Sequence, residues 1–227
     1  MSASFRLILI VALVALPASA VEPQPSATPV AWELTIQPAP LMRIAVGGKN
    51  YWYMIYTVTN DTGQDIDFNP EIVRVSEIDN ETPAEKAAAN PSAAPSIRTE
   101  PAIVGVDSKV FKAISDRHAK TYPFLVTPVK AIDRLLQGKD NARTSVAVFP
   151  ELDPRISHFT IYIGGLSGER IARTNPSYDA ARPADDKENP KLFVLQKTLA
   201  LPYTLPGDVR TRRSAEPALG KMGWVMR

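Results

Sequence analysis

The sequence of 227 residues predicts a mainly β fold, namely an antiparallel immunoglobulin-like β-sandwich with one or two short inserted helices. Apolar residues alternate with polar ones in the first and last thirds of the chain, whereas the middle has apolar residues at helical spacing. Strands, then helices, then strands again favour two packed antiparallel sheets. The chain has no cysteine, so packing must hold the fold without a disulfide.

The first 20 residues predict a cleavable secretory signal peptide. Arg6 precedes the apolar run 7–16, and Pro17 ends that run before the small residues Ala18 and Ala20. The run is about half as long as the roughly 20 apolar residues that cross a membrane, which favours cleavage over an anchor. No cysteine follows it to carry a lipid. We therefore expect a secreted or periplasmic protein with no stable membrane insertion after cleavage.

Composition divides the rest of the chain into three parts. Residues 21–29 are rich in proline and predict an extended spacer, and residues 30–206 predict the β-sandwich domain. Residues 207–227 form a basic C-terminal tail. The formal net charge of +2 excludes a strongly polyanion-directed protein, and an exported chain is not expected to bind nucleic acid.

The strongest strand signal is Tyr51–Thr59, which is dense in aromatic and β-branched residues. Both of its faces carry large side chains, which predicts a central strand that is buried on both sides. Shorter alternating segments at 31–36 and 41–46 predict strands before it.

A turn at 60–63 follows the aromatic strand, and Gly63 is suited to positive φ in that turn. Extended segments at 65–68 and 72–78 then predict a hairpin. Residues 80–101 contain mostly alanine, proline, serine and glutamate. Such a segment buries little apolar surface, so we expect a mobile insertion there.

Two helices are predicted in the middle of the chain. Asp107 is the expected N-cap of the first, whose apolar residues recur at helical spacing up to His118. The second is expected to start at Thr127-Pro128, to run through Leu136 and to stop at Gly138.

Three further strands are predicted at 144–149, 158–163 and 192–201. In the last of these, alternation places Phe193, Leu195, Leu199 and Leu201 on one face, which we expect to be part of the core. A polar loop at 175–190 precedes that strand.

The two histidines and one serine are candidates for catalytic chemistry. His118 and His158 have no partner at metal-binding spacing, so they are interpreted as ordinary surface or edge residues. Ser167 follows Gly165 as in a nucleophile elbow, but Glu169 stands where that motif needs a second glycine. A turn between strands is the better interpretation of this site.

Two groups of acids could hold a metal or perform hydrolysis. Asp65, Asp67, Asn69 and Glu71 recur at every second position, which suits either a calcium site or the solvated face of a strand. The second group lies in the polar loop, where paired carboxylates could hydrolyse glycosides or could simply be solvated. It comprises Asp179, Asp185, Asp186 and Glu188. Strand alternation and loop composition favour the solvated interpretation of both groups.

The tail carries five basic residues, which suit either simple solvation or attraction to a cell-surface polyanion or an acidic partner. They are Arg210, Arg212, Arg213, Lys221 and Arg227. The apolar segment Trp224–Met226 is expected to pin the tail onto the domain or onto a partner.

Four segments carry a resemblance to a known family, namely 52–60, 164–169, 205–212 and 224–227. They resemble an uncharacterised family of exported bacterial proteins. The resemblance implies a periplasmic or surface setting and no known activity or site residues.

The leading functional hypothesis is a non-enzymatic immunoglobulin-like module that binds a protein or cell-envelope partner. No catalytic, cofactor-binding or metal-binding residue and no cofactor is predicted. A metal-dependent hydrolase that uses carboxylates and a purely structural envelope component are the alternatives.

Overall fold

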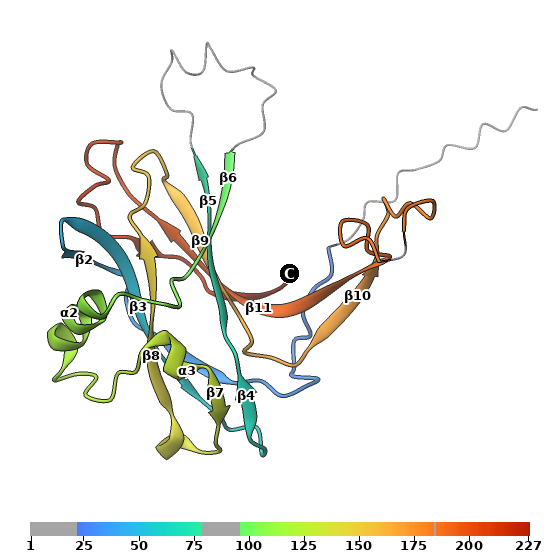
Figure 1. Ribbon diagram of the computed structural model, residues 1–227, viewed down its shortest axis with the longest axis horizontal. Helices are drawn as coiled ribbons and strands as arrows, with labels where there is room; N and C mark the ends of the chain where they lie inside the picture. The colour runs from blue at the N-terminus through green and yellow to red at the C-terminus, as the bar shows by residue number, and fades with distance from the viewer. Residues whose placement is uncertain (1–21, 79–95, 184) are drawn as a thin grey trace, which may run out of the picture.

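The computed structural model describes residues 22–78, 96–183 and 185–227, so the expected signal peptide at 1–20 lies outside the described residues. The fold is mainly β, with antiparallel sheets and two α-helices (Figure 1). The strands of the first half are β1 (Thr35–Pro38), β2 (Met42–Val46), β3 (Lys49–Thr59), β4 (Ile66–Phe68), β5 (Glu71–Ile78) and β6 (Ser96–Pro101). The remaining strands are β7 (Asp133–Leu135), β8 (Arg143–Pro150), β9 (His158–Gly164), β10 (Arg170–Thr174), β11 (Leu192–Thr204), β12 (Ala218–Leu219) and β13 (Gly223–Met226).

The first sheet is built around β3, the predicted aromatic strand. Strands β1 and β2 pair with its two halves along one edge, and β8 pairs with it along the other. Trp52 faces the main core, and Tyr53 faces a second apolar cluster. The prediction of a central strand buried on both sides is therefore confirmed.

The second sheet has the order β10–β11–β9–β5–β6, with β12 and β13 on the other edge of β11. The hairpin expected between β3 and the segments after it is wrong, because β5 pairs with β9 and β6 and lies in the second sheet. The buried side chain of Asn60 explains this redirection. Its amide donates to the carbonyls of Gln64 and Leu135 and holds the chain in a loop at the end of β3.

The main core lies between the two sheets. Its members include Trp52 and Tyr56 from β3, together with Ile161 from β9 and Leu201 from β11. Each large apolar side chain buried in this way contributes roughly 1.5–3 kcal/mol. The sheets are therefore held face to face by packing.

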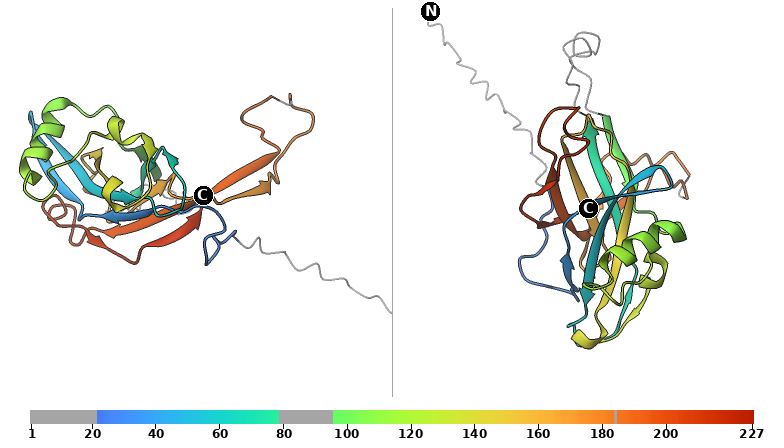
Figure 2. Two further views of the ribbon diagram at one scale, coloured as in Figure 1. Left: turned by 90° about the horizontal axis from the view of Figure 1, so that it is seen from below. Right: turned by 90° about the vertical axis from the view of Figure 1, so that its left-hand side faces the viewer.

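Helix α2 (Ser108–His118) covers the outer face of the first sheet (Figure 2). Asp107 caps it as predicted, since its side chain accepts a hydrogen bond from the amide of Lys109. Val110 and Ile114 are buried against the second apolar cluster.

Helix α3 (Pro128–Ala131) is shorter than the helix predicted through Leu136. Ile132 adopts an extended conformation, and the next residues form β7, which pairs with β4. Leu135 is fully buried in the main core as part of this strand. Burial of one leucine and pairing with β4 outweigh the helical spacing that the sequence suggested.

Two segments that were expected to lie outside the sheets contribute strands. Residues 80–95 of the expected insertion lie outside the described residues, but Ser96–Pro101 form β6 on the edge of β5. In the tail, β13 pairs with β11, and Trp224 packs against the main core.

Candidate binding site

A two-stranded ribbon projects from the body of the molecule (Figures 1 and 2). We define the ribbon as β10 together with Leu192–Gln196 at the start of β11. The two segments pair antiparallel, with Ile171 opposite Leu195 and Ala172 opposite Val194. In the described part of the chain, no further strand pairs with β10 or with Leu192–Leu195.

The ribbon exposes large apolar side chains on both faces. The exposed fractions of Leu192, Phe193 and Val194 are 50%, 43% and 62%. The expectation that Phe193 and Leu195 belong to the core is therefore wrong, whereas Leu199 and Leu201 are buried as predicted. The physical reason is that β9 pairs with β11 only from Leu199 onward, so the earlier residues extend past the core between the two sheets.

The charged residues of the ribbon, and the residue directly before its second strand, are all basic. Arg170 and Arg173 lie on β10 and Lys191 precedes β11, and all three are exposed. Within the described ranges, none of the three side chains forms a hydrogen bond or an ion pair. No acid lies within either paired segment. The ribbon therefore offers apolar surface together with unneutralised positive charge.

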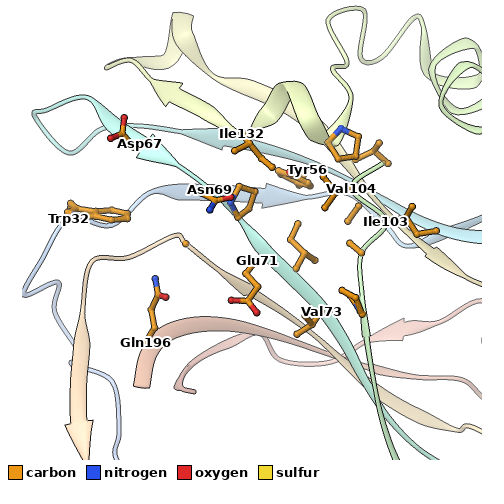
Figure 3. Close-up of a pocket in the computed structure, with 18 of the residues that line it drawn as sticks. Trp32, Tyr56, Asp67, Asn69, Glu71, Val73, Ile103, Val104, Ile132 and Gln196 are labelled. Carbon is orange, nitrogen blue, oxygen red and sulfur yellow. The ribbon is translucent and has the colours of Figure 1, made fainter. Parts of the chain in front are cut away.

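A surface cavity of about 510 Å³ opens at the base of the ribbon (Figure 3). Its volume lies within the roughly 300–1,000 Å³ typical of ligand pockets. Trp32, Asn69 and Glu71 line it near the start of β5, and Arg170 and Gln196 line it from the ribbon. The cavity therefore combines an aromatic ring with amide and charged groups.

Gln196 connects the cavity to one face of the ribbon. Side chains alternate across a strand, so Val194 and Leu192 lie on the same ribbon face as Gln196. On the body side, Ile132 and Val104 line the cavity and are 40% and 49% exposed. Exposed apolar groups are therefore present on the body side of the cavity and on the ribbon face that carries Gln196.

Two glycines fix the base of the ribbon. Gly165 has a φ of 78°, and a Cβ atom there would lie 2.5 Å from the carbonyl oxygen of Asn69. At Gly168, a Cβ atom would lie 2.5 Å from Nε1 of Trp32. These glycines let the chain leave β9, pass close to the cavity wall and enter β10.

A buried ionic cluster anchors the other side of the ribbon base. The Lys197 Nζ atom lies 2.9 Å from Glu33 Oε2 and 3.2 Å from Glu169 Oε2, and it donates to the carbonyl of Ser26 at 3.1 Å. Glu169 also accepts from the amide of Ser26 at 2.8 Å. The cluster attaches part of the expected spacer to β11.

Hydrogen bonds and charge set the protonation of this cluster. The backbone hydrogen bond from Ser26, reinforced by Lys197, lowers the pKa of Glu169. Desolvation by itself lowers the pKa of Lys197, but hydrogen bonds to Glu33 and Glu169 outweigh it and raise the pKa. Lys197 and Glu169 therefore stay charged at neutral pH and hold the base of the ribbon together.

The candidate catalytic residues lie on separate elements. His118 ends α2, and its Nε2 atom lies 2.9 Å from the Tyr53 hydroxyl. His158 begins β9, and its Nδ1 atom lies 2.8 Å from the Ser157 hydroxyl. Ser167 is buried, and its hydroxyl accepts from the amide of Glu169. That short-range bond matches the turn predicted there.

The acids at 65–71 follow the strand alternation. Ile66 and Phe68 are buried and Asp67 is exposed, as the solvated-face interpretation predicts. The described residues contain no group of three or more histidine or acidic side chains arranged to hold a metal ion.

Two acids of the polar loop pair with the loop's own arginine. Arg182 Nη2 lies 2.6 Å from Asp186 Oδ2 and 3.7 Å from Glu188 Oε2. Asp179 instead accepts from the amide of Ala181 and closes a local turn. These acids support the loop that connects the two ribbon strands.

The basic tail is partly folded onto the body. Arg212 is buried, and its carbonyl accepts from the Arg43 guanidinium at 2.8 Å. Arg43 in turn stacks 4.0 Å from the ring centroid of Trp52. The segment after Thr204 therefore packs against the first sheet before it returns to β11 as β13.

Comparison of the chain with protein-family models, with curated proteins and with solved structures finds no match. Within the described residues, no helix combines the length and the apolar character that crossing a membrane requires.

Proposed function

We propose that this protein is an exported, non-enzymatic immunoglobulin-like module that binds a protein partner through the ribbon and the adjoining cavity. The ribbon carries the proposal. Leu192, Phe193 and Val194 are all at least 43% exposed on a segment that contributes little to the core. Contiguous exposed apolar surface of this kind is typical of protein interaction sites.

The strand order supports the immunoglobulin-like part of the proposal. The neighbours β1–β3–β8 correspond to strands A, B and E of that fold, and β11–β9–β5–β6 correspond to G, F, C and C′. Trp52 fills the space between the sheets without a neighbouring disulfide. The ribbon is then an elongation of the F–G hairpin, and immunoglobulin variable domains use their F–G loop for recognition.

The sequence supports export to the periplasm or the exterior through the signal peptide expected at 1–20 and the exported bacterial family that the chain resembles. A role outside the cytoplasm also fits the absence of cysteine, because the fold does not depend on the redox state of its surroundings.

The experiment is a comparative capture from the cell-envelope fraction. The purified protein is immobilised beside a Leu192→Asp/Val194→Asp variant and a Phe124→Asp control, since Phe124 is 86% exposed, follows α2 and does not line the cavity. We expect the unmodified protein and the Phe124 control to retain the same partner and the ribbon variant to lose it. Identical retention by all three proteins would contradict the proposed site.

A further inference from the structure

The open edge of β10 offers a binding mode more specific than apolar contact. We propose that it accepts an extended segment of the partner as an added strand, and that this segment reads acidic, apolar, apolar, acidic. This inference deepens the proposed function and rests on it. It concerns the chemistry of the partner at the same ribbon.

The first step is the unpaired backbone of β10. Residues Arg170–Thr174 use one edge to pair with β11, and no described strand pairs with the other edge. An exposed strand edge presents amides and carbonyls that are ready to pair with an incoming strand. Addition of a strand to such an edge is a recurrent mode of peptide recognition.

The second step is the spacing of the two arginines. Arg170 and Arg173 are separated by Ile171 and Ala172, so the arginines lie on opposite faces of β10. A strand added beside β10 places one residue opposite each of these four positions. Opposite charges across a strand pair attract, so acidic residues fit opposite the two arginines.

The third step concerns the apolar positions. Ala172 lies opposite Val194, which is 62% exposed, and Ile171 lies opposite Leu195. Apolar residues added opposite Ala172 and Ile171 would extend these two rows across a third strand. Three-stranded sheets are also more stable than an isolated two-stranded ribbon.

The resulting pattern reads the same in both directions. The partner segment therefore has the same requirement whether it adds parallel or antiparallel to β10. The charge of the ribbon also disfavours a second copy of this chain, because pairing two β10 edges would bring four arginines into one ladder with no acid.

The test measures the affinity of fluorescein-labelled peptides for the purified protein by fluorescence anisotropy. The first peptide contains Glu-Val-Val-Glu between Thr-Gly ends, and the second contains Val-Glu-Glu-Val with the same composition and charge. The third contains Lys-Val-Val-Lys. We expect the first to bind about fivefold or more tightly than the second, and the third to bind most weakly.

Variants locate the binding. Arg173→Glu should weaken the Glu-Val-Val-Glu peptide by about five- to tenfold. The matched control Arg210→Glu makes the same charge change on an exposed residue of the tail and should leave affinity unchanged. Successive amides of a strand point to opposite edges, so N-methylation of one of the two valines should weaken binding by removing a ladder hydrogen bond, and N-methylation of the other should weaken it less.

Equal affinity for the first two peptides, or equal effects of the two arginine variants, would overturn the inference. So would a dimer in sedimentation experiments that disappears in the Val194→Asp variant, because it would assign the edge to a second copy. Peptides that fail to bind while comparative capture still distinguishes the ribbon variant would overturn the strand addition alone. Failure of both experiments would overturn the proposed function as well.

Discussion

At the scale of single residues, the buried charges connect segments that are distant in sequence. Arg74 is 1% exposed, and its Nη2 atom lies 2.5 Å from Glu100 Oε2 and 3.1 Å from the carbonyl of Pro150. It thereby ties β5 to β6 and to the end of β8. Removal of one partner from such a pair is costly because the other charge is left without compensation.

Asp153 predicts how stability depends on pH. The hydrogen bonds from the Arg155 side chain, at 2.8 and 3.1 Å, lower the pKa of Asp153 from 3.8 to about 2. A carboxyl whose pKa is lower in the folded state stabilises the protein above its unfolded pKa and loses that contribution as pH falls. We therefore expect the free energy of unfolding to fall between about pH 4 and pH 2 partly through this residue.

Urea unfolding at several pH values measures this effect. The free energy of unfolding of an Asp153→Asn variant should depend less steeply on pH than that of the unmodified protein over the same acidic range. Asp67→Asn is a suitable control, because Asp67 is 94% exposed and its ion pair is long, with 4.0 Å between Asp67 Oδ1 and an arginine nitrogen. An unchanged slope in the Asp153 variant would show that other carboxyls carry the acid sensitivity.

At the scale of elements, strands with regular alternation and helices with a clear cap could be predicted from the sequence. The Tyr51–Thr59 strand and the Asp107 cap are present in the structure. The predicted helix beyond Ala131 is wrong, because its short apolar spacing also suits a strand that buries Leu135. Local pattern alone does not distinguish these outcomes, since tertiary pairing decides between them.

The turn after β9 gives a prediction for an element boundary. Gly165→Ala should destabilise the protein by about 3 kcal/mol, because it combines positive φ with a Cβ atom 2.5 Å from the Asn69 carbonyl oxygen. Gly63→Ala has a similar φ but no atom within 4 Å of its Cβ, so a loss of about 1 kcal/mol is expected. Chemical denaturation of both variants tests the difference. Equal losses would show that the turn relaxes away from Asn69.

At the scale of the whole molecule, the sequence could predict a β-rich fold but not the proposed binding site. Leu192–Leu195 are four consecutive apolar residues, and alternation places them on both faces of a strand. Such a run fits a strand whose two faces are both buried and equally a strand whose two faces are both exposed, so the run alone does not distinguish the two. Only the points along β11 where β9 and β13 stop pairing with it show that this run extends beyond the core between the sheets.

The same geometry predicts that the ribbon is separable from the fold. The main core contains residues of β11 from Leu199 onward and none from β10. Replacement of residues 173–193 by Asn-Gly would join Ala172 to Val194, which already face each other, through a two-residue turn of the type that hairpins prefer.

We expect this shortened protein to melt within about 4 °C of the parent, which corresponds to a change of less than roughly 1 kcal/mol. It should also lose binding of the envelope partner and of the Glu-Val-Val-Glu peptide. The replacement removes Arg173, which is proposed to face an acidic residue of the added strand, together with most of the exposed apolar surface. Differential scanning calorimetry and fluorescence anisotropy on one preparation measure both properties. A large drop in melting temperature would mean that the ribbon stabilises the rest of the fold, and its exposed apolar residues would then be better explained by folding than by recognition.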